Sequence, residues 1–240
     1  MTALPGATNP FDKLVNTHDP EALAQYYAER EKALGPYIER LTKADPNLPY
    51  ISAYIMAGDL HRADEVYVLL ADGAITWEQA QSMTGSYGRM DLRARAFDEG
   101  LIGELQAIEG LPHAWSGSDP DDTDPRFLAL WRLAFKANRY RTVRDPKGRP
   151  IMTDPGMSGT VHVYRGQDKG APFGIAWSLS KVVATKFAKG AATRQSNRQG
   201  VVYEGWVPRK SILGYCVERS ESEVILDPLA LVGEIGRAHV

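Results

Sequence analysis

The sequence predicts an α+β protein, in which an N-terminal helical region precedes a small, mostly antiparallel β core of two sheets with peripheral helices. Apolar residues recur at helical spacing through the first half of the chain. From residue 160 onward they gather in short runs rich in Val, Tyr and Trp, as is typical of strands. The segment 116–125 lacks large apolar side chains and separates the two patterns. This predicts an acidic helical domain over 1–120 and a basic domain over 121–240.

The helical region opens with a clear start signal. Asp19 is a suitable N-cap, Pro20 fits the first helical position and Glu21 places an acid in the first turn. Gly35-Pro36 is expected to stop or kink this helix, because proline donates no backbone hydrogen bond. Further helices are predicted over 36–43, 62–70, 76–83 and 90–108, and a basic amphipathic helix around 127–139.

The β core is predicted from short apolar segments with turn residues between them. A helix over 181–189 interrupts the series, and a polar loop over 190–200 follows it. The predicted strands are 160–165, 174–179, 200–207, 212–217 and 223–226.

The charges divide unevenly along the chain. The formal net charge is −2, yet residues 1–125 carry 9 Lys and Arg against 21 Asp and Glu, and residues 126–240 carry 19 against 9. A basic half would concentrate a dianionic dinucleotide near it, and this leaves nucleic acid open as a partner. The alternative is that the two halves dock on each other through complementary faces.

Several classes of site are not expected. Cys216 is the single cysteine, so no internal disulfide can form, and the five histidines lack metal-ligand spacing. No glycine-rich phosphate loop precedes a helix, so neither a P-loop nor a Rossmann-type dinucleotide site is expected. No apolar stretch is long enough for a bilayer, and the first ten residues do not resemble a signal peptide. We therefore expect no membrane association, and a protein that is cytoplasmic or delivered into a host cytoplasm.

Three short motifs in the last third carry candidate chemistry. They are Tyr164-Arg165-Gly166, Trp177-Ser178-Leu179-Ser180 and Glu221-Ser222-Glu223, each on or beside a predicted strand. They supply a cation for a pyrophosphate, two hydroxyls, and two carboxylates that share a face of an extended segment. Each motif alone has an ordinary interpretation: a surface ion pair, a helix N-cap and a solvated strand edge.

In this order the motifs resemble the arginine-serine-glutamate class of mono-ADP-ribosyltransferases. The resemblance covers roughly residues 126 to 230. It implies a two-sheet core like that of these enzymes, NAD as substrate and no metal. It also implies that Arg165, following the aromatic Tyr164, holds the NAD phosphates, with Gly166 leaving room for their approach. Ser180 completes the Ser-x-Ser motif, although Leu179 replaces the more usual small polar residue between the serines.

The resemblance also implies separate roles for the remaining residues. Glu223 would stabilise the sugar cation left when nicotinamide departs, and Ser178 would hydrogen-bond the Glu223 carboxylate. Glu221 would orient or deprotonate the acceptor, and an acid there implies arginine as the acceptor. Further candidates are Trp177, Phe187 and Tyr203 as an aromatic wall for nicotinamide, and Arg194 and Arg198 on a loop over the phosphates.

The resemblance therefore implies transfer of ADP-ribose from NAD to an exposed arginine of a target protein, as in bacterial toxins and phage-encoded modifiers of host proteins. The alternatives are ADP-ribosylation of a nucleic acid or a small molecule, hydrolysis of NAD, or a degenerate transferase core that serves as an interaction scaffold. The acidic half has no assigned role, and its charge suggests a mask over the basic half that salt would weaken.

Overall fold

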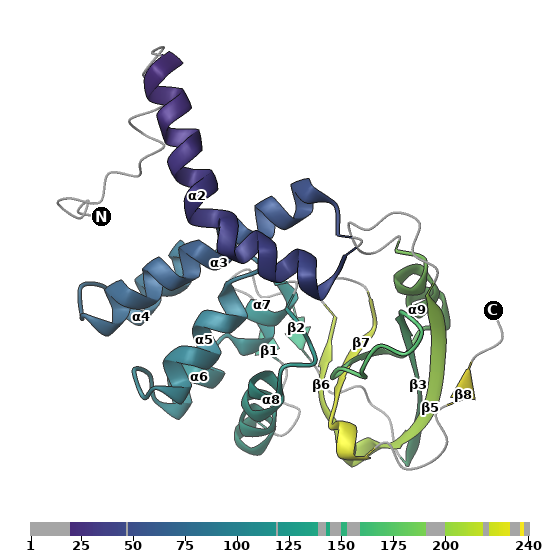
Figure 1. The fold of residues 1–240 in the computed structure, drawn as a ribbon. Coiled ribbons are helices and arrows are strands. Elements are labelled where there is room, and N and C mark those ends of the chain that lie inside the picture. The colour runs from purple at the N-terminus through teal and green to yellow at the C-terminus, as the bar shows by residue number, and fades with distance from the viewer. Residues whose placement is uncertain are drawn as a thin grey trace. The chain divides into compact units, whose positions relative to one another are not determined.

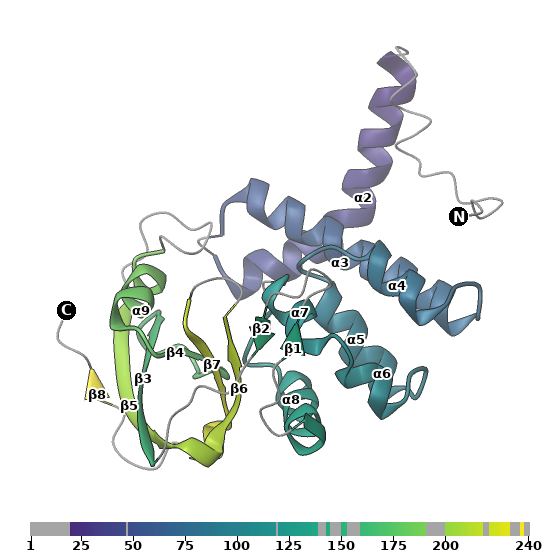
Figure 2. The same cartoon turned by 180° about the vertical axis from the view of Figure 1, so that it is seen from behind.

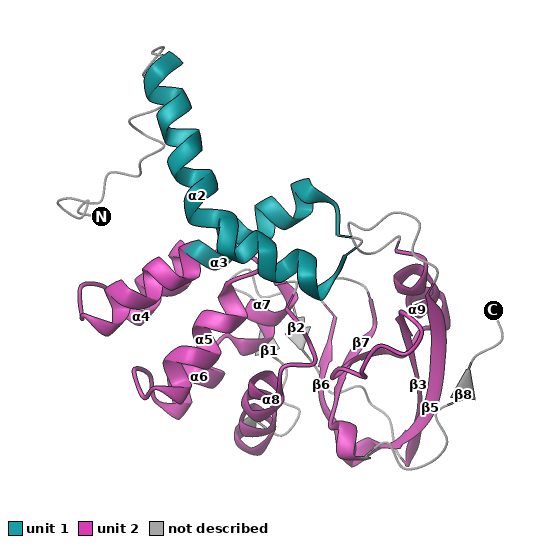
Figure 3. Ribbon diagram, viewed as in Figure 1, with its two compact units in different colours: residues 1–61 teal, residues 62–240 magenta. Residues whose placement is uncertain are grey.

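The computed structural model describes residues 20–46, 48–118, 120–138, 143–144, 150–152, 159–190, 200–217, 221–230 and 236–237. The chain divides into two compact units, residues 1–61 and 62–240 (Figure 3). This division differs from the boundary predicted at 120/121, because the helices that follow residue 62 share an apolar core with the strands.

The first unit contains α2 (Pro20–Ala44) and the first part of α3 (Tyr50–Ala71). Helix α2 continues through Pro36, where the sequence predicted a stop or a kink and a second short helix. Proline removes only one backbone donor, and the turns on either side are rich in strong helix formers such as Ala, Glu, Lys and Leu. Local propensity therefore outweighs the lost hydrogen bond.

The second unit begins with a series of helices. Helix α4 (Trp77–Met83) starts at a capping box, in which the Gln79 amide donates to Thr76 Oγ1 at 3.3 Å and the Thr76 amide donates to Gln79 Oε1 at 2.8 Å. The helix predicted over 90–108 is two helices, because Gly100 adopts a left-handed φ of 73° between them. The remaining helices are α5 (Arg89–Asp98), α6 (Glu104–Ile108), α7 (Leu111–Ser116) and α8 (Pro125–Asn138).

Five strands form a single antiparallel sheet in the order β6-β7-β4-β3-β5 (Figures 1 and 2; β4 is labelled in Figure 2). Short pieces extend its edges: β1 (Val143–Arg144) and β2 (Pro150–Met152) beside β6, and β8 (Gly236–Arg237) beside β5. The five strands are β3 (Thr160–Gln167), β4 (Ala176–Ser178), β5 (Val201–Pro208), β6 (Ile212–Cys216) and β7 (Glu223–Leu226). The short helices η1 (Arg209–Ser211) and η2 (Pro228–Ala230) follow β5 and β7.

The prediction of two sheets is wrong for the described strands, and the short strand β4 is the reason. It pairs with β7 along its whole length and with β3 at a single position, Tyr164 opposite Ser178. This one contact joins the strand pair β3–β5 to the pair β6–β7. Such continuity depends on register and leaves no mark in the hydrophobic pattern.

Helices cover two parts of the sheet. Helix α9 (Lys181–Ala188) lies against β3 and β5, and α8 lies against β6 (Figures 1 and 2). A buried cluster joins the helices of the second unit to β6 and β7, and its members include Met90, Leu111, Trp115, Trp131, Leu213 and Ile225. None of the described helices has the length and apolar character that a membrane crossing requires.

Candidate functional site

The register aligns polar side chains in a row across the sheet. Tyr164 on β3 lies opposite Ser178 on β4, and Ser178 lies opposite Glu223 on β7. Glu204 on β5 and Cys216 on β6 extend the row at its two ends. Residues that lie opposite each other in antiparallel strands project from the same face. The structure therefore brings together Tyr164, Ser178 and Glu223 from the three sequence motifs.

The turn 221–223 is held against β4 by two hydrogen bonds. The Ser178 hydroxyl donates to the backbone carbonyl of Glu221 at 2.7 Å, and the Leu179 amide donates to the carbonyl of Ser222 at 2.9 Å. Ser222 has a φ of 48°, and within the described part of the chain no other non-glycine residue has a positive φ. Such a conformation costs on the order of 1–3 kcal/mol and persists where its surroundings enforce it. The serine motif thus fixes the shape of the glutamate turn.

The hydroxyl proton of Ser178 has a different acceptor from the one expected. The resemblance implied the carboxylate of Glu223, whereas the structure directs the hydroxyl to the main chain of Glu221. Ser178 Oγ also accepts the amide of Ser180 at 3.0 Å. Ser180 in turn caps α9, because its Oγ accepts the amide of Val183 at 3.4 Å. The serine motif therefore supports Glu223 through the backbone of the turn.

The Glu223 carboxylate accepts a hydrogen bond from a helix of the same unit. The indole Nε1 of Trp115, on α7, donates to Glu223 Oε1 at 3.2 Å. Trp115 is only 3% exposed and packs edge-to-face on Trp131 and Phe127 of α8, with ring centroids 5.8 and 6.3 Å apart. Sequence reasoning missed Trp115, because the two residues are 108 positions apart and nothing in either local pattern links them.

Arg165 projects from the opposite face of the sheet to Tyr164 and contacts an acidic residue. Its Nη1 and Nη2 donate to the two carboxylate oxygens of Asp122 at 2.6 and 2.9 Å, and Nη1 and Nε also donate to the Ala176 carbonyl and the Gln167 side chain. The side chains of Arg165 and Asp122 are 13% and 17% exposed. Binding of NAD phosphates by Arg165 stays a prediction, and it requires this ion pair to open.

Asp122 also anchors the segment predicted as a linker. Its Oδ2 accepts the Ala176 amide at 2.9 Å, and its carbonyl accepts the Ile175 amide at 3.0 Å. Asp122 therefore ties this segment to the start of β4.

The other cofactor-binding candidates occupy varied environments. A Cβ on Gly166 would lie 1.8 Å from the Ala184 carbonyl, so this glycine allows α9 to approach β3 closely.

Trp177 is 2% exposed, and its Nε1 donates to the Gly174 carbonyl at 3.1 Å, as in an ordinary core residue. Phe187 is half-buried on α9. Tyr203 is half-buried against Phe173. Arg194 and Arg198 lie outside the described residues.

A second polar cluster lies at the β5 end of the row. His162 Nδ1 is 3.1 Å from the Tyr164 hydroxyl, and His162 Nε2 is 3.3 Å from Glu204 Oε2. The imidazole stacks on the indole of Trp206, with centroids 4.3 Å apart and an interplanar angle of 7°. These contacts fix the orientation of the Tyr164 ring beside Ser178.

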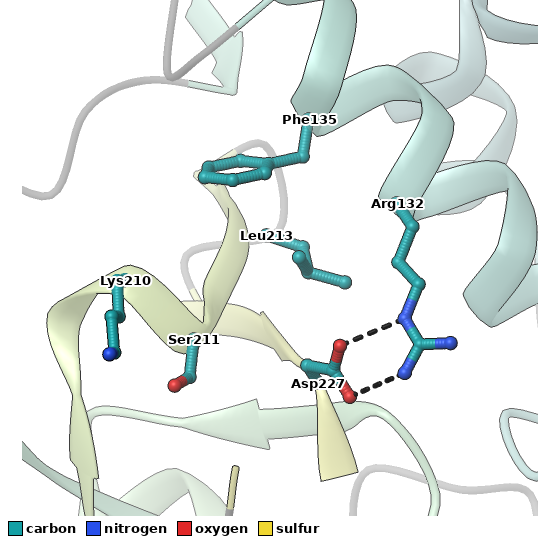
Figure 4. Close-up of a pocket in the computed structure, with 6 residues that line it drawn as sticks. All are labelled: Arg132, Phe135, Lys210, Ser211, Leu213 and Asp227. Atoms are coloured by element: carbon teal, nitrogen blue, oxygen red, sulfur yellow. Dashed lines mark hydrogen bonds and ion pairs between the residues drawn. The ribbon is translucent and has the colours of Figure 1, made fainter. Parts of the chain in front are cut away.

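A pocket of about 310 Å³ lies at the other end of β7 from Glu223 (Figure 4). Within it, Arg132 of α8 forms a bidentate salt bridge to Asp227, in which Nε and Nη2 each donate to a carboxylate oxygen at 2.8 Å. Because its two facing charges satisfy each other and it contains none of the candidate residues, we do not assign the reaction to it. It is lined by Arg132, Phe135, Lys210, Ser211, Leu213 and Asp227.

No cluster of three or more His, Cys, Asp and Glu suited to a metal ion occurs among the residues that the structure describes. In comparisons with known proteins, no family model matches the chain, and neither the curated proteins nor the solved structures contain a match.

Proposed function

We propose that this protein cleaves NAD at the bond between ribose and nicotinamide and transfers ADP-ribose to an arginine side chain of a target protein. The observation that carries the proposal is the turn 221–223, which presents two carboxylates and is held by Ser178 and Leu179 of the neighbouring strand. The coupling of a Ser-x-Ser strand to a Glu-x-Glu turn agrees with the motif order that resembles the arginine-serine-glutamate transferases.

The chemistry needs a fixed negative charge beside the ribose. Nicotinamide leaves as a neutral molecule from a cationic precursor, so the barrier depends chiefly on stabilising the positive charge that develops on the sugar. A preorganised carboxylate does this best when it need not reorient during the reaction. Glu223 suits this role, because it begins β7 and its Oε1 accepts the indole N–H of Trp115.

The second carboxylate is proposed to act on the acceptor. Glu221 lies on the other side of the left-handed Ser222, so its backbone is fixed by the same turn. An arginine acceptor needs its guanidinium oriented, and a proton removed as the new bond forms. A carboxylate that pairs with the guanidinium can perform both tasks.

The test uses the full chain with NAD that carries a label in its adenylate part. Incubation with a mixture of arginine-rich protein and RNA is followed by separation of protein, nucleic acid and small molecules. The proposal predicts labelled protein and free nicotinamide. Hydroxylamine should release the label from the protein more readily than it would release ADP-ribose bound to a cysteine thiol. The same reaction with a protein whose arginines have been blocked by a dicarbonyl reagent is the control for the acceptor.

The other outcomes correspond to the alternative functions. Labelled RNA would identify a nucleic acid acceptor, and ADP-ribose without labelled macromolecule would identify an NAD glycohydrolase. Unchanged NAD under all conditions would leave an interaction scaffold and would contradict the proposal.

A further inference from the structure

We propose that Trp115 is a positioning residue, which holds the Glu223 carboxylate through its indole N–H, so that a helix ahead of the β core is part of the catalytic unit. The kinetic part of this inference rests on the proposed function. The spectroscopic part tests the contact itself and needs no NAD.

The first step is the contact. Trp115 Nε1 donates to Glu223 Oε1 at 3.2 Å, and the indole is 3% exposed. A hydrogen bond from a buried donor to a carboxylate is stronger than one between neutral groups, because water screens it poorly. The donor therefore selects one orientation of the Glu223 side chain.

The second step is the support of the donor. Trp115 packs edge-to-face on Trp131, with an interplanar angle of 84°, and on Phe127, with an angle of 83°. The rings of α8 thus hold the indole from behind, and the hydrogen bond connects this rigid cluster to the first residue of β7. A side chain fixed by packing can position a catalytic group closely, as a flexible one cannot.

A second tryptophan allows the hydrogen bond of Trp115 to be tested separately from its packing. Trp131 lies in the same cluster and is fully buried, yet its Nε1 has no hydrogen-bond partner. Replacing either tryptophan by phenylalanine removes a similar volume from the same core. Only Trp115→Phe also removes a donor from the Glu223 carboxylate. Trp131→Phe is therefore the matched control.

The kinetic experiment measures nicotinamide release by the full-length wild type and both variants, each shown by circular dichroism to be folded at the assay temperature. Trp115→Phe should lower kcat by about 10- to 100-fold and leave KM for NAD within about twofold. The reason is that the lost hydrogen bond positions the Glu223 carboxylate, which is proposed to stabilise the transition state and not the bound substrate. Trp131→Phe keeps an aromatic ring against Trp115 and leaves the Trp115 indole N–H in place, so it should lower kcat by no more than about threefold. Equal losses of kcat in the two variants would overturn the positioning role and leave the proposed function standing.

The spectroscopic experiment observes the indole N–H resonances of the five tryptophans in a ¹⁵N-labelled protein. The Trp115 and Trp131 signals are assigned from the two phenylalanine variants. Glu223→Ala should move the Trp115 indole proton upfield, since its acceptor is lost, and should leave the Trp131 signal in place. An unmoved Trp115 signal would overturn the inference whether or not the wild type acts on NAD, whereas a wild type that releases no nicotinamide would refute the proposed function alone.

Discussion

Ser178 connects the start of α9 to the turn 221–223 through the hydrogen bonds of one hydroxyl group. Its oxygen accepts the Ser180 amide and its proton goes to the Glu221 carbonyl, so one hydroxyl joins the start of α9 to the glutamate turn. A net contribution of about 1 kcal/mol is typical of such a bond. Its larger effect is geometric, because it fixes the turn that carries both carboxylates.

The two carboxylates should separate in their effects. Glu221→Ala should preserve release of nicotinamide into water and abolish transfer of label to arginine-containing protein, because the charge beside the ribose is retained and the acceptor base is lost. Parallel assays of nicotinamide and of labelled protein measure both quantities. Full protein labelling by the folded variant would refute the assigned role of Glu221.

A second prediction concerns Arg165. Its guanidinium, which the resemblance implied would bind the NAD phosphates, is paired with the Asp122 carboxylate in the structure. If NAD displaces Asp122, Asp122→Asn should bind NAD more tightly by removing the competing charge. Arg165→Lys should bind it about tenfold or more weakly, because it loses the paired hydrogen bonds. Calorimetric titration of both folded variants measures this. Unchanged affinity in both would leave Arg165 with a structural role alone.

At the scale of elements, helix α8 is joined to the end of β7 by Arg132 and Asp227. The hydrogen bonds from Arg132 hold the pKa of the Asp227 carboxyl below its ordinary value, although partial burial opposes them. The folded pKa is thus lower than the unfolded one, so the pair stabilises the fold above about pH 4 and loses this effect as the pH falls further.

Asp227→Asn tests this pair. The variant should lose at most about 1 kcal/mol at pH 7, because the Arg132 side chain is 43% exposed and exposed ion pairs contribute little. The difference from wild type should shrink towards pH 3. Urea unfolding at the two pH values, in a double-mutant cycle with Arg132→Gln, measures the coupling. A larger difference at the lower pH would contradict the sign of the pKa shift.

Much of the element pattern could be predicted from the sequence. The strand predicted over 223–226 coincides with β7, and the helix predicted over 76–83 corresponds to α4, with Thr76 as its N-cap. Local patterns could not reveal that α2 continues through Pro36. They also could not reveal that β4 joins all five strands into one sheet, because both outcomes depend on competition between local and distant contacts.

At the scale of the molecule, the core of the second unit combines helices and strands. Trp77, Trp115 and Trp131 lie in one buried cluster with Leu213 and Ile225. A boundary near residue 120 would cut through this cluster and remove Trp115 from Glu223. The helices after residue 62 are therefore part of the fold that supports the site, which is a different role from the salt-sensitive mask suggested by their charge.

Truncation tests this view. A chain that starts at Asp124 loses Trp77 and Trp115 from the core and should therefore lack cooperative unfolding by circular dichroism and calorimetry. It should also release nicotinamide more slowly than the full chain at low salt. A folded fragment that acts on NAD faster than the full chain would support the mask instead.

The candidate site could be predicted from the sequence only in part, because its geometry depends on contacts between distant segments. Alternation along strands indicates which residues share a face. The resemblance linked Ser178 with Glu223, and the two lie opposite each other, although the Ser178 hydroxyl donates to the Glu221 carbonyl. Whether Tyr164 or Arg165 faces them depends on a register that a shift of one residue reverses. The Trp115 contact depends on packing between distant segments, and no local pattern predicts it.

In the proposed reaction the Glu223 carboxylate drives cleavage of the nicotinamide bond. Glu223→Gln keeps the shape of the side chain and an oxygen for the Trp115 indole, but removes the negative charge. Nicotinamide release from NAD should be measured for the purified full-length wild type and for this variant, with both shown to have the same unfolding midpoint. We expect release by the wild type and a loss of about 10²-fold or more in the variant, because the charge that stabilises the sugar cation is gone. Equal release by the two proteins would contradict it.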